Sequence, residues 1–576
     1  MQGSWTHSLP ATGAKRAEEG LRTRLGRGVW VRGCLRWWGP ATTLFHTRSL
    51  PHSTSPHQAA VNNTTDADLP PDTLQYATCL WTRDVSNVAL ALFTAGEVAP
   101  AARAVRALAA LYSRADHAAV MDKMTAAQGA GYDNFTCAPV RFHAASGDRT
   151  DPWAHQQLDA LGLFLTAYGT LCTAGHVTPD LALISRFVRY LDAIQYWQRP
   201  DLGHWEEWPP LVRTSSVGCC VAGLQACAPL FEAAAAQNGG VGADAAHTNG
   251  VAGSIARSSS TGRTLGDSGA GGSVTARDVL ALADKGWAVL QTRLGRPPPD
   301  SDGGGEARMS GGGGEGRNSE GGQWHPSDGD AWEAPGRKDD AAMLTLLLPP
   351  VARQLGLTTW QREALAASAL RLRRPHGVLR YERDSYYGAD YQQRLRSWKA
   401  HHTDVDPAAY PHATVRDSWA LEGCEAQWTI FEPLLLLHFL HVHSTCPRPG
   451  PPGSPQGCAE SAGDVRRSLM RILAAIEEEP AAPPPKRSSS LNGTGSGSFF
   501  DDTPEDTSQA AAPQPPPKVQ CAAELTDVRL HVHESYTVVT GRRGPNDVQD
   551  LLWAVAYIRM ALAVLAGHLG SGGCFH

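Results

Sequence analysis

Helical periodicity is the feature of this 576-residue sequence that most restricts its fold. Apolar residues recur with a period near 3.6 in many segments, whereas the strict alternation of a β-strand is nearly absent. The pattern predicts helices over residues 85–113, 155–174, 178–197, 215–234, 277–293, 340–354, 358–373, 426–443, 463–477 and 546–567. The stretches LDALGLFLTAYGTL and LLWAVAYIRMALAVL are apolar around much of their circumference, which is typical of helices buried on more than one side. The sequence therefore predicts a layered all-α body: a bundle, a solenoid or an α/α barrel, although no fixed-period repeat of a solenoid is present.

Three low-complexity stretches interrupt the helices. Residues 236–275 are rich in Gly, Ala and Ser, residues 296–338 contain DGGGEARMSGGGGEGRNSEGG, and residues 446–519 are rich in Pro, Ser and Gly on either side of one expected helix. Such compositions bury too little apolar surface to offset the entropy of ordering. We expect one domain over residues 66–576 with long disordered insertions, rather than several domains.

The N-terminal 65 residues form an expected extension to this domain. The first 55 or so carry seven arginines and one lysine against Glu18 and Glu19, with no apolar core after the basic start. That composition resembles an organellar transit segment more than a secretory signal. The alternative is an extension without a targeting role. The expected location is intracellular, either cytoplasmic or in a plastid.

The charge of the chain and its cysteines indicate which partners and which cellular compartment to expect. A net charge of −6 and a pI near 6.4 give no electrostatic reason to expect binding to nucleic acid or to an anionic membrane. The apolar stretch 551–567 is short and contains Arg559, which favours a buried helix over a membrane span. The twelve cysteines form no CxxC pair, so we expect most of them to be buried apolar residues in a reducing compartment.

Clustered histidines raise the question of a metal site. His438, His441 and His443 follow a leucine run, and His531 and His533 alternate in RLHVHES. No matching arrangement of carboxylates and histidines accompanies them, which favours surface or core histidines. We therefore expect no metal and no cofactor.

The connectors between the helices carry the candidate chemistry. They are unusually rich in Trp, Arg, Asp and Glu, and the four most similar are LWTRDV (80–85), DPWAHQQLDALG (151–162), DLGHWEEW (201–208) and LRYERDSYYGADYQ (379–392). Arginine and carboxylate groups make paired hydrogen bonds to vicinal hydroxyls, and aromatic faces pack on sugar rings. Each connector alone has a structural explanation, such as a local Arg83–Asp84 ion pair. Together they predict one carbohydrate pocket.

These motifs resemble those of glucoamylase-type glycoside hydrolases of family 15. LWTRD, GHWEEW and RYERDSYY are similar to the family patterns W-x-R-D, W-E-E and R-Y-x-x-D-x-Y, which line the pocket of an (α/α)₆ barrel. WAHQQLDALGLFL, SSVGCCVAGLQA and EAQWTIFEPLLL resemble the branch that includes the phosphorylase kinase regulatory α and β subunits and their bacterial and algal relatives. The resemblance runs from about residue 74 to residue 567, with gaps at the insertions. It implies an (α/α)₆ barrel.

The resemblance also implies a role for each matching residue. Glu206 matches the general acid that protonates the departing glycosidic oxygen, and Glu207 matches a residue that holds substrate hydroxyls. Two pairs match those that grip the sugar, and three aromatic residues match the pocket walls: Arg83 with Asp84, Arg380 with Asp384, and Trp81, Trp153 and Trp205. A general acid needs a raised pKa, which partial burial against Trp205 and Trp208 would provide.

An inverting hydrolase needs a second carboxylate, about 6.5–9.5 Å from the first, to activate water. The best positional match is Glu524 in CAAELTD, which precedes the stretch GPNDVQDLLWAVAYI that resembles the final helix of the family. Leu525 and Thr526 depart from the polar and aromatic neighbours of the family pattern, and Glu425 in EAQW is the alternative base.

The leading functional prediction is an inverting, exo-acting glycoside hydrolase that releases glucose from the non-reducing ends of α-glucans or maltooligosaccharides. The alternative is a non-catalytic glucan-sensing barrel, similar to the phosphorylase kinase regulatory subunits, which would act through a protein partner. A third prediction is another chemistry on α-glycosides, such as phosphorolysis or lyase action. A retained pocket without a base would favour the sensing protein.

Overall fold

The computed structural model describes residues 79–150, 153–239, 273–294, 332–334, 337–388, 390–402, 412–445, 456–478, 530–532, 535–539, 542–545 and 552–570. The chain divides into two compact units, one of Met1–His46 with Glu477–His531 and one of Thr47–Ile476 with Val532–His576. All described helices lie in the second, here called the helical unit. The predictions for residues 1–65, for most of the three insertions and for Glu524 fall outside the described residues.

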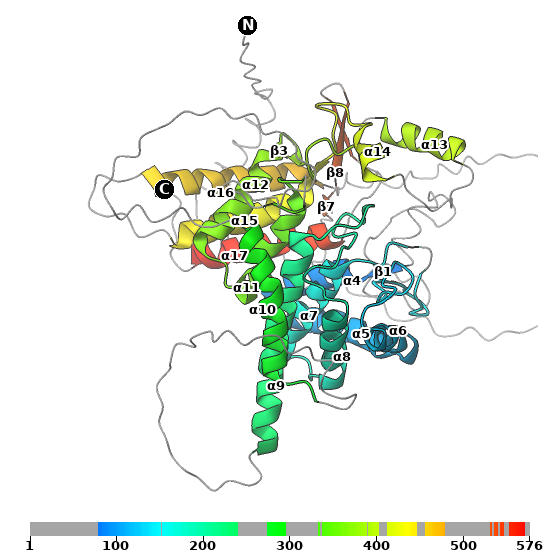
Figure 1. The fold of residues 1–576 in the computed structure, drawn as a ribbon. Coiled ribbons are helices and arrows are strands. Elements are labelled where there is room, and N and C mark those ends of the chain that lie inside the picture. Colours follow the sequence, from blue (N-terminus) through cyan, green and yellow to red (C-terminus); the bar gives the residue numbers. More distant parts are fainter. Residues whose placement is uncertain are drawn as a thin grey trace, which may run out of the picture. The chain divides into compact units, whose positions relative to one another are not determined.

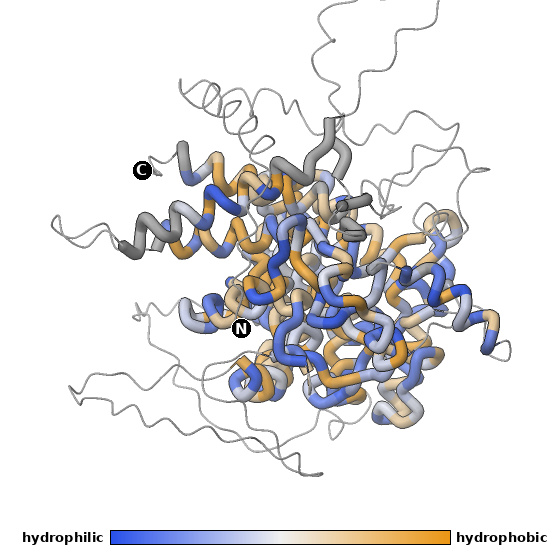
Figure 2. Tube along the Cα trace, turned by 90° about the horizontal axis from the view of Figure 1, so that it is seen from above, coloured by the Kyte–Doolittle hydropathy of each residue, from blue (hydrophilic) through white to orange (hydrophobic). Residues whose placement is uncertain are grey.

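Helices dominate the helical unit (Figure 1). In chain order they are α4 (Thr82–Thr94), α5 (Val98–Ser113), α6 (Ala115–Ala126), α7 (Leu158–Thr173), α8 (Leu181–Ala193), α9 (Thr214–Gly239), α10 (Ala276–Arg293), η3 (Ala341–Leu347), α11 (Pro349–Leu355), α12 (Thr359–Arg371), α13 (Tyr391–His401), α14 (Ala413–Asp417), η4 (Thr429–Phe431), α15 (Glu432–Thr445), α16 (Gln456–Ala475) and α17 (Leu552–Gly570). Hydrophobic and hydrophilic residues are interspersed along the helical turns of the trace in Figure 2.

Local chemistry sets several helix ends. The Asp180 side chain accepts a hydrogen bond from the Leu183 amide at 3.0 Å and so begins α8. Capping boxes begin α10 at Thr275 and α12 at Thr358. Gly96, with φ +85°, separates α4 from α5, which the periodicity had predicted as one helix over residues 85–113.

Six helical segments, here called the ring members, pack side by side in a closed ring. α4 packs against α7, α7 against α9, and α9 against the consecutive segments η3 and α11. Of these two segments, η3 packs against α15. α15 packs against α17, and α17 packs against α4, which closes the ring. The helices α5, α8, α10, α12 and α16 lie between ring members in the chain and contact one or both of the members they connect. This alternation is that of an (α/α)₆ barrel, and the predicted all-α fold class is confirmed.

Small residues let two ring helices approach closely. A Cβ added to Gly162 of α7 would lie 2.3 Å from the Cys219 carbonyl carbon of α9, and one added to Gly169 would lie 2.6 Å from that of Ala226. Both contacts advance in the same direction along the two helices, so α7 and α9 are parallel. Cys219, Cys220 and Cys227 are buried, as the sequence predicted for most of the cysteines.

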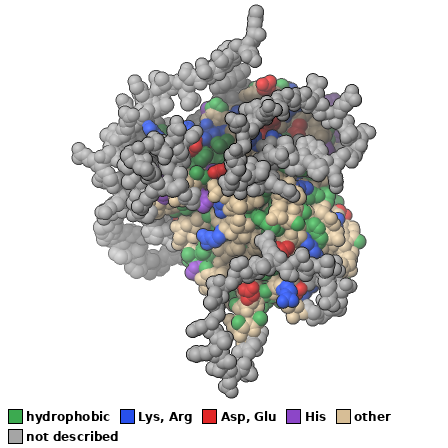
Figure 3. Space-filling model, turned by 60° about the vertical axis from the view of Figure 1, so that its left-hand side comes forward, with side chains coloured by type: hydrophobic (Ala, Val, Ile, Leu, Met, Phe, Trp, Pro, Cys, Tyr) green, Lys and Arg blue, Asp and Glu red, His purple; other side chains and the backbone are tan. Residues whose placement is uncertain are grey.

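α9 also contains the one described stretch, Thr214–Gln237, that is long and apolar enough to cross a membrane. Of its most apolar window, 72% is buried inside the fold. Its place in the ring accounts for that apolar character, because neighbouring helices cover it on several sides. Charged side chains of both signs are dispersed over the described surface of the face in Figure 3.

Short strands fill the connectors. β1 (Cys79–Trp81) pairs antiparallel with β2 (Arg141–His143), which places Trp81 opposite Arg141. An antiparallel sheet has the order β3 (Arg373–Arg374), β4 (Gly377–Val378), β5 (Gln427–Trp428), β8 (Ser535–Val539) and β9 (Arg542–Pro545). The strands β6 (Ile476–Glu478) and β7 (Leu530–Val532) pair with each other. None is long enough to produce an alternating pattern in the sequence.

Candidate active site

Polar side chains of the helical unit gather where ring helices begin. Arg83 lies in the first turn of α4, Asp159 lies in the first turn of α7, and residues 201–208 precede α9. Arg83 joins all three, because its Nε donates to Asp159 Oδ2 at 2.6 Å and its Nη2 donates to the Gly203 carbonyl at 2.9 Å. The helix N-termini therefore converge on one end of the ring, where their dipoles favour negative charge.

Arg83 is buried and makes further contacts on both sides of this junction. Its Nη2 donates to Gln157 Oε1 at 2.8 Å, and its Nη1 donates to Glu206 Oε1 at 3.2 Å. Burial alone would raise the pKa of Asp159, but the charge of Arg83 and the neighbouring His204 hold it below its ordinary value. Arg83 is thus fixed in orientation by an ionised partner, with one edge directed at Glu206.

Asp84, the other half of the first predicted gripping pair, lies beside Arg83 in the same helical turn. Its side chain is buried, and burial raises its pKa to about 7 although the Arg83 charge acts in the opposite direction. A substantial fraction of Asp84 is therefore protonated at neutral pH. In that form its hydroxyl donates, so the residue can both donate to and accept from a ligand hydroxyl.

A tight turn separates the two neighbouring glutamates. Gly203 has φ +60° and Glu206 has φ +57°, and the Glu206 amide donates to the Gly203 carbonyl at 3.1 Å. A Cβ on Gly203 would lie 2.0 Å from Cδ of the buried Arg213, so only glycine fits there. Left-handed backbone at a glutamate is uncommon and is typical of functional sites. The turn gives Glu206 and Glu207 different surroundings.

Glu206 remains partly accessible. Its side chain is 22% exposed and contacts Arg83. Burial raises the pKa of Glu206, while the positive charges of Arg83 and Arg141 oppose the shift without cancelling it. A carboxyl group with a raised pKa and access to solvent can deliver a proton to a bound ligand at a higher pH than an ordinary glutamate can.

Glu207 is buried among cations instead. Its Oε2 accepts from Arg337 Nη1 at 2.7 Å, and its Oε1 accepts from Arg380 Nη2 at 3.1 Å and from the Tyr381 hydroxyl at 2.8 Å. Arg416 Nη2 also donates to Oε1. Burial would raise the pKa of Glu207, but Arg337, Arg416 and Arg380 together hold it well below its usual range. Glu207 is therefore ionised at neutral pH.

The second predicted pair is formed and is joined to Glu207. Arg380 Nε donates to Asp384 Oδ2 at 2.6 Å, and its Nη2 donates to Asp384 Oδ1 at 2.8 Å. The Tyr386 amide also donates to Asp384 Oδ1, at 3.0 Å. The Arg380 guanidinium lies 5.0 Å from the centre of the Trp205 ring. The connector that contains RYERDSYY thus meets the connector that contains GHWEEW.

The three tryptophans that were predicted to line the pocket have different surroundings. Trp81 and the half-buried Trp153 meet edge to face with their ring centres 6.2 Å apart, and Arg141 lies 3.8 Å from the centre of the Trp153 ring. Trp205 is buried and donates from Nε1 to Asp340 Oδ1 at 2.8 Å. Trp153 is the most accessible of these rings, and Trp205 anchors the glutamate turn to the segment that starts η3.

The predicted second carboxylate, Glu524, lies outside the described residues. The alternative base, Glu425, is a half-buried residue just before β5. A further carboxylate, Asp417, is in contact with the glutamate pair through Tyr381, whose hydroxyl lies 3.0 Å from Asp417 Oδ1. The described part of the chain contains no group of three or more His, Cys, Asp and Glu residues arranged to hold a metal ion.

Sequence reasoning missed several residues of this cluster. Asp159, Gln157 and Tyr381 lie inside the quoted connectors, and their proximity to the candidate residues was the available signal. Arg337 and Arg416 lie outside the four connectors, in GRKDD and TVRDSW. Nothing in those segments identifies them, because they reach Glu207 from 130 and 209 positions away.

Comparison with known proteins supports the resemblance. Residues 55–301 match the family described as Glycosyl hydrolases family 15. The match covers less than half of the chain, and it includes Arg83, Asp84, Glu206 and Glu207 but not Arg380, Asp384 or Glu524. No curated protein matches the sequence. The particular likeness to phosphorylase kinase regulatory subunits stays a prediction.

Solved structures of glycosidases are distantly similar. One, in complex with glucose, is 16% identical with a TM-score of 0.46 and covers 98% of this chain and 99% of that chain. A wild-type glycosidase is 17% identical with a TM-score of 0.45 and covers 86% of this chain and 89% of that chain. These similarities are too distant to assign a function.

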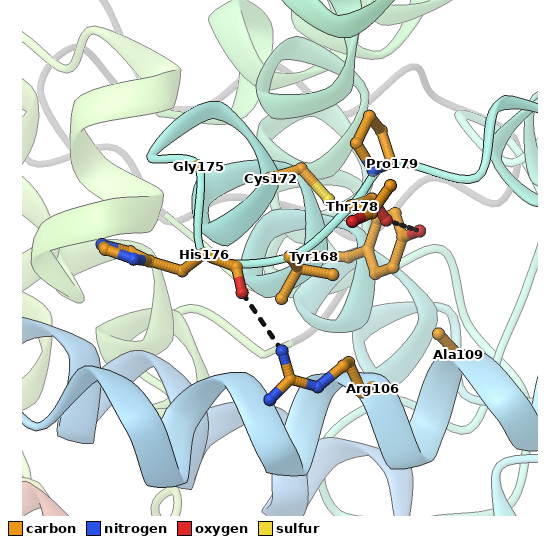
Figure 4. Close-up of a pocket in the computed structure, with 9 residues that line it drawn as sticks. Arg106, Ala109, Tyr168, Cys172, Gly175, His176, Thr178 and Pro179 are labelled. Atoms are coloured by element: carbon orange, nitrogen blue, oxygen red, sulfur yellow. Dashed lines mark hydrogen bonds between the residues drawn. The ribbon is translucent and has the colours of Figure 1, made fainter.

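A pocket of about 570 Å³ lies at the other end of α7 (Figure 4). Its lining includes Tyr168 and Cys172 of α7, the loop from Gly175 to Pro179, and Arg106 of α5. Arg106 Nη1 donates to the carbonyl of His176 at 3.2 Å, and the Asp180 amide donates to the Tyr168 hydroxyl at 2.8 Å. These groups serve the loop that leads to α8, and the lining holds no carboxylate.

Proposed function

We propose that the protein is an inverting, exo-acting glycoside hydrolase that releases glucose from the non-reducing ends of α-glucans or maltooligosaccharides. The observation that carries the proposal is the contrast within the glutamate pair. Glu206 is partly exposed with a raised pKa, whereas the adjacent Glu207 is buried and ionised among three arginines. One residue is suited to donating a proton and the other is not.

The reaction divides between two carboxyl groups. Glu206 protonates the glycosidic oxygen, and the bond from that oxygen to the anomeric carbon breaks as charge develops on the ring. A base on the opposite face removes a proton from water, whose oxygen bonds to the anomeric carbon and inverts its configuration. We assign the base role to Glu524. The net result is consumption of one water and release of β-glucose.

The surrounding groups support binding of a neutral sugar. Arg83 and Asp84 lie at the start of α4 beside Glu206, and Arg83 keeps a contact with the acid. Asp84 can exchange donor and acceptor roles because its pKa is about 7. Trp153, half-buried and backed by Arg141, offers an aromatic surface at the same site.

The proposal is tested with purified full-length protein and maltooligosaccharides. Proton NMR distinguishes β-glucose from α-glucose as the first product, and β-glucose is expected. Glu206→Gln is expected to lower kcat by about 10²–10⁴-fold, because the amide cannot donate the proton. The matched control is Glu382→Gln, since Glu382 is exposed on the neighbouring connector. Equal glucose release by Glu206→Gln and wild type would refute the assignment of the acid.

The same assay separates hydrolysis from the sensing alternative. If the protein binds maltooligosaccharides but releases no glucose, the result favours a non-catalytic glucan-sensing function over hydrolysis. Activity that requires inorganic phosphate and yields a sugar phosphate would instead indicate phosphorolysis.

A further inference from the structure

Burial and four protein donors separate the Glu207 carboxylate from any ligand. Oε1 accepts hydrogen bonds from Arg380, Tyr381 and Arg416, and Oε2 accepts one from Arg337. The residue is only 2% exposed. Three of these donors crowd around Oε1, and the burial of the side chain closes the approach to Oε2. A sugar hydroxyl could reach Glu207 only by displacing one of these charged donors.

The neighbouring carboxylate, Asp417, is in a different state. It ends the short helix α14, which is attached beside the glutamate pair because the Ala413 amide donates to the Trp208 carbonyl at 2.8 Å. Its side chain is half-buried, and among the described residues its hydrogen bond is the one with Tyr381. Asp417 therefore combines a fixed position with free acceptor capacity.

The Tyr381 hydroxyl connects the two carboxylates and has a single proton. It lies 2.8 Å from Glu207 Oε1 and 3.0 Å from Asp417 Oδ1. When both carboxylates are ionised, the hydroxyl can donate to only one of them. Glu207 keeps three arginine donors in either case, whereas Asp417 then depends on this one proton or on a donor from outside the cluster. A sugar hydroxyl is a donor of that kind.

We propose that Glu207 is a positioning residue that assembles Arg337, Arg380 and Arg416, and that Asp417 accepts a hydrogen bond from a hydroxyl of the bound sugar. The inference rests on the proposed function for its ligand, a neutral glucose unit. It moves the hydroxyl-binding role that the family resemblance implies for Glu207 to a residue 210 positions further along the chain. Asp417 thereby helps to determine which sugars bind.

The electrostatics of the cluster agree with this division. Burial and the negative charge of Glu207 raise the pKa of Asp417 to about 6, while Arg337, the Tyr381 hydroxyl and Arg416 act in the opposite direction. These are the groups that face Asp417 from the glutamate turn, the segment before η3, the connector after β4 and α14 itself. Asp417 is an ionised, strong acceptor above about pH 6 and becomes a weaker, neutral acceptor as the pH falls below it.

Binding is measured by isothermal titration calorimetry with maltotriose and the full-length protein, in wild type and in a Glu206→Gln background. Asp417→Asn is expected to raise Kd about tenfold at pH 7.5, because an ionised acceptor is replaced by a neutral one. We expect wild type to bind more weakly below about pH 6, and Asp417→Asn is expected to remove that pH dependence. The matched control is Glu422→Gln, an exposed carboxylate of the same segment, for which no change is expected.

Glu207→Gln is expected to behave differently, because the three arginines that meet at Glu207 lose the negative charge that they share. Its Tm should fall by about 5 °C or more. Asp417→Asn should unfold close to the wild-type temperature. A Glu207→Gln protein of unchanged Tm and weakened maltotriose binding would overturn the positioning role. Unchanged Kd and an unchanged pH profile for Asp417→Asn would overturn its role as an acceptor.

Failure of this inference and failure of the proposed function give different results. Wild type that binds maltotriose without cleaving it removes hydrolysis and leaves the Asp417 test intact. Wild type that cleaves maltotriose, with Asp417→Asn equal to it in Kd and KM, removes the role of Asp417 alone. Wild type that neither binds nor cleaves maltotriose contradicts both. A rise in KM with kcat within about twofold distinguishes lost binding from a general loss of structure.

Discussion

The two ends of helix α7 differ in chemistry although the same ring of helices builds both. At its N-terminal end, Asp159 is bound by Arg83, and charged groups from several connectors meet Glu206 and Glu207. At its C-terminal end, Arg106 and Tyr168 bind backbone groups of the loop that leads to α8. The difference follows from the parallel ring helices, which put their N-termini, with unsatisfied N–H groups and positive dipole ends, on one side. Ionised carboxylates such as Asp159 are stabilised there.

Outside the glutamate pair, the largest expected effect comes from Arg83, which links three connectors at the N-terminal end. Lysine in its place keeps the charge but cannot bond Asp159, Gln157, the Gly203 carbonyl and Glu206 together. Arg83→Lys is expected to lower kcat/KM for maltotriose by about 10²-fold, because the acid and its turn lose their position. Steady-state kinetics checks this against Arg186→Lys, a half-buried arginine that is paired with Asp122 far from this network. Equal kcat/KM values for the two variants would mean that the connectors keep their arrangement without Arg83.

The all-α fold was predictable because helical periodicity is a local property of the sequence. α7, α9 and α10 appear close to the predicted ranges. The predicted helix boundaries were wrong where a single residue determines them. Gly96 separates α4 from α5. The extended backbone of Leu348 before Pro349 divides the predicted helix 340–354 into η3 and α11. The predicted helix 426–443 likewise begins later, because β5 and η4 precede α15 at Glu432.

The site was predictable only where motif residues are close in sequence. Glu206, Glu207, Arg83 and Arg380 were identifiable from their aromatic and charged neighbours, and the structure brings all four into one network. Arg416 was not identifiable, because its contact with Glu207 arises from the folding of α14 against Trp208. The arginine charges that lower the pKa of Glu207, but not that of Glu206, likewise come from distant segments, so the pattern EE alone could not assign the two roles.

The close packing of α7 against α9, which supports both ends of α7, can be tested at Gly162. A methyl group there would lie 2.3 Å from backbone of α9, so the helices must separate. Gly162→Ala is expected to reduce the free energy of unfolding by about 1–3 kcal/mol. Urea denaturation measures the change. Gly567→Ala in α17 is the control, since nothing lies within 4 Å of the added carbon and alanine is the better helix former. Similar losses in both variants would contradict the close approach of α7 and α9.

The electrostatics of the N-terminal end can be sharpened with Arg141, whose charge opposes the raised pKa of Glu206. An acid catalyst is active while protonated, so activity is lost as the pH rises through its pKa. Arg141→Gln removes a charge that favours ionisation, and the pKa of Glu206 should rise further. The alkaline limb of the kcat profile is therefore expected to move to higher pH. Arg186→Gln, a surface change, should leave the limb in place. Movement to lower pH would exclude Glu206 as the group that titrates.

The smallest effect is expected at the C-terminal end of α7. Arg106→Ala removes a hydrogen bond between an exposed side chain and the His176 carbonyl, and should change the free energy of unfolding by no more than about 0.5 kcal/mol. Its kcat/KM for maltotriose should stay within about twofold of wild type, because the length of α7, about 24 Å, separates Arg106 from Asp159. The contrast with Arg83→Lys then measures how completely chemistry is confined to one end of the ring. A large loss of activity in Arg106→Ala would mean that α7 transmits a change from one end to the other, and the pocket in Figure 4 would become a candidate regulatory site.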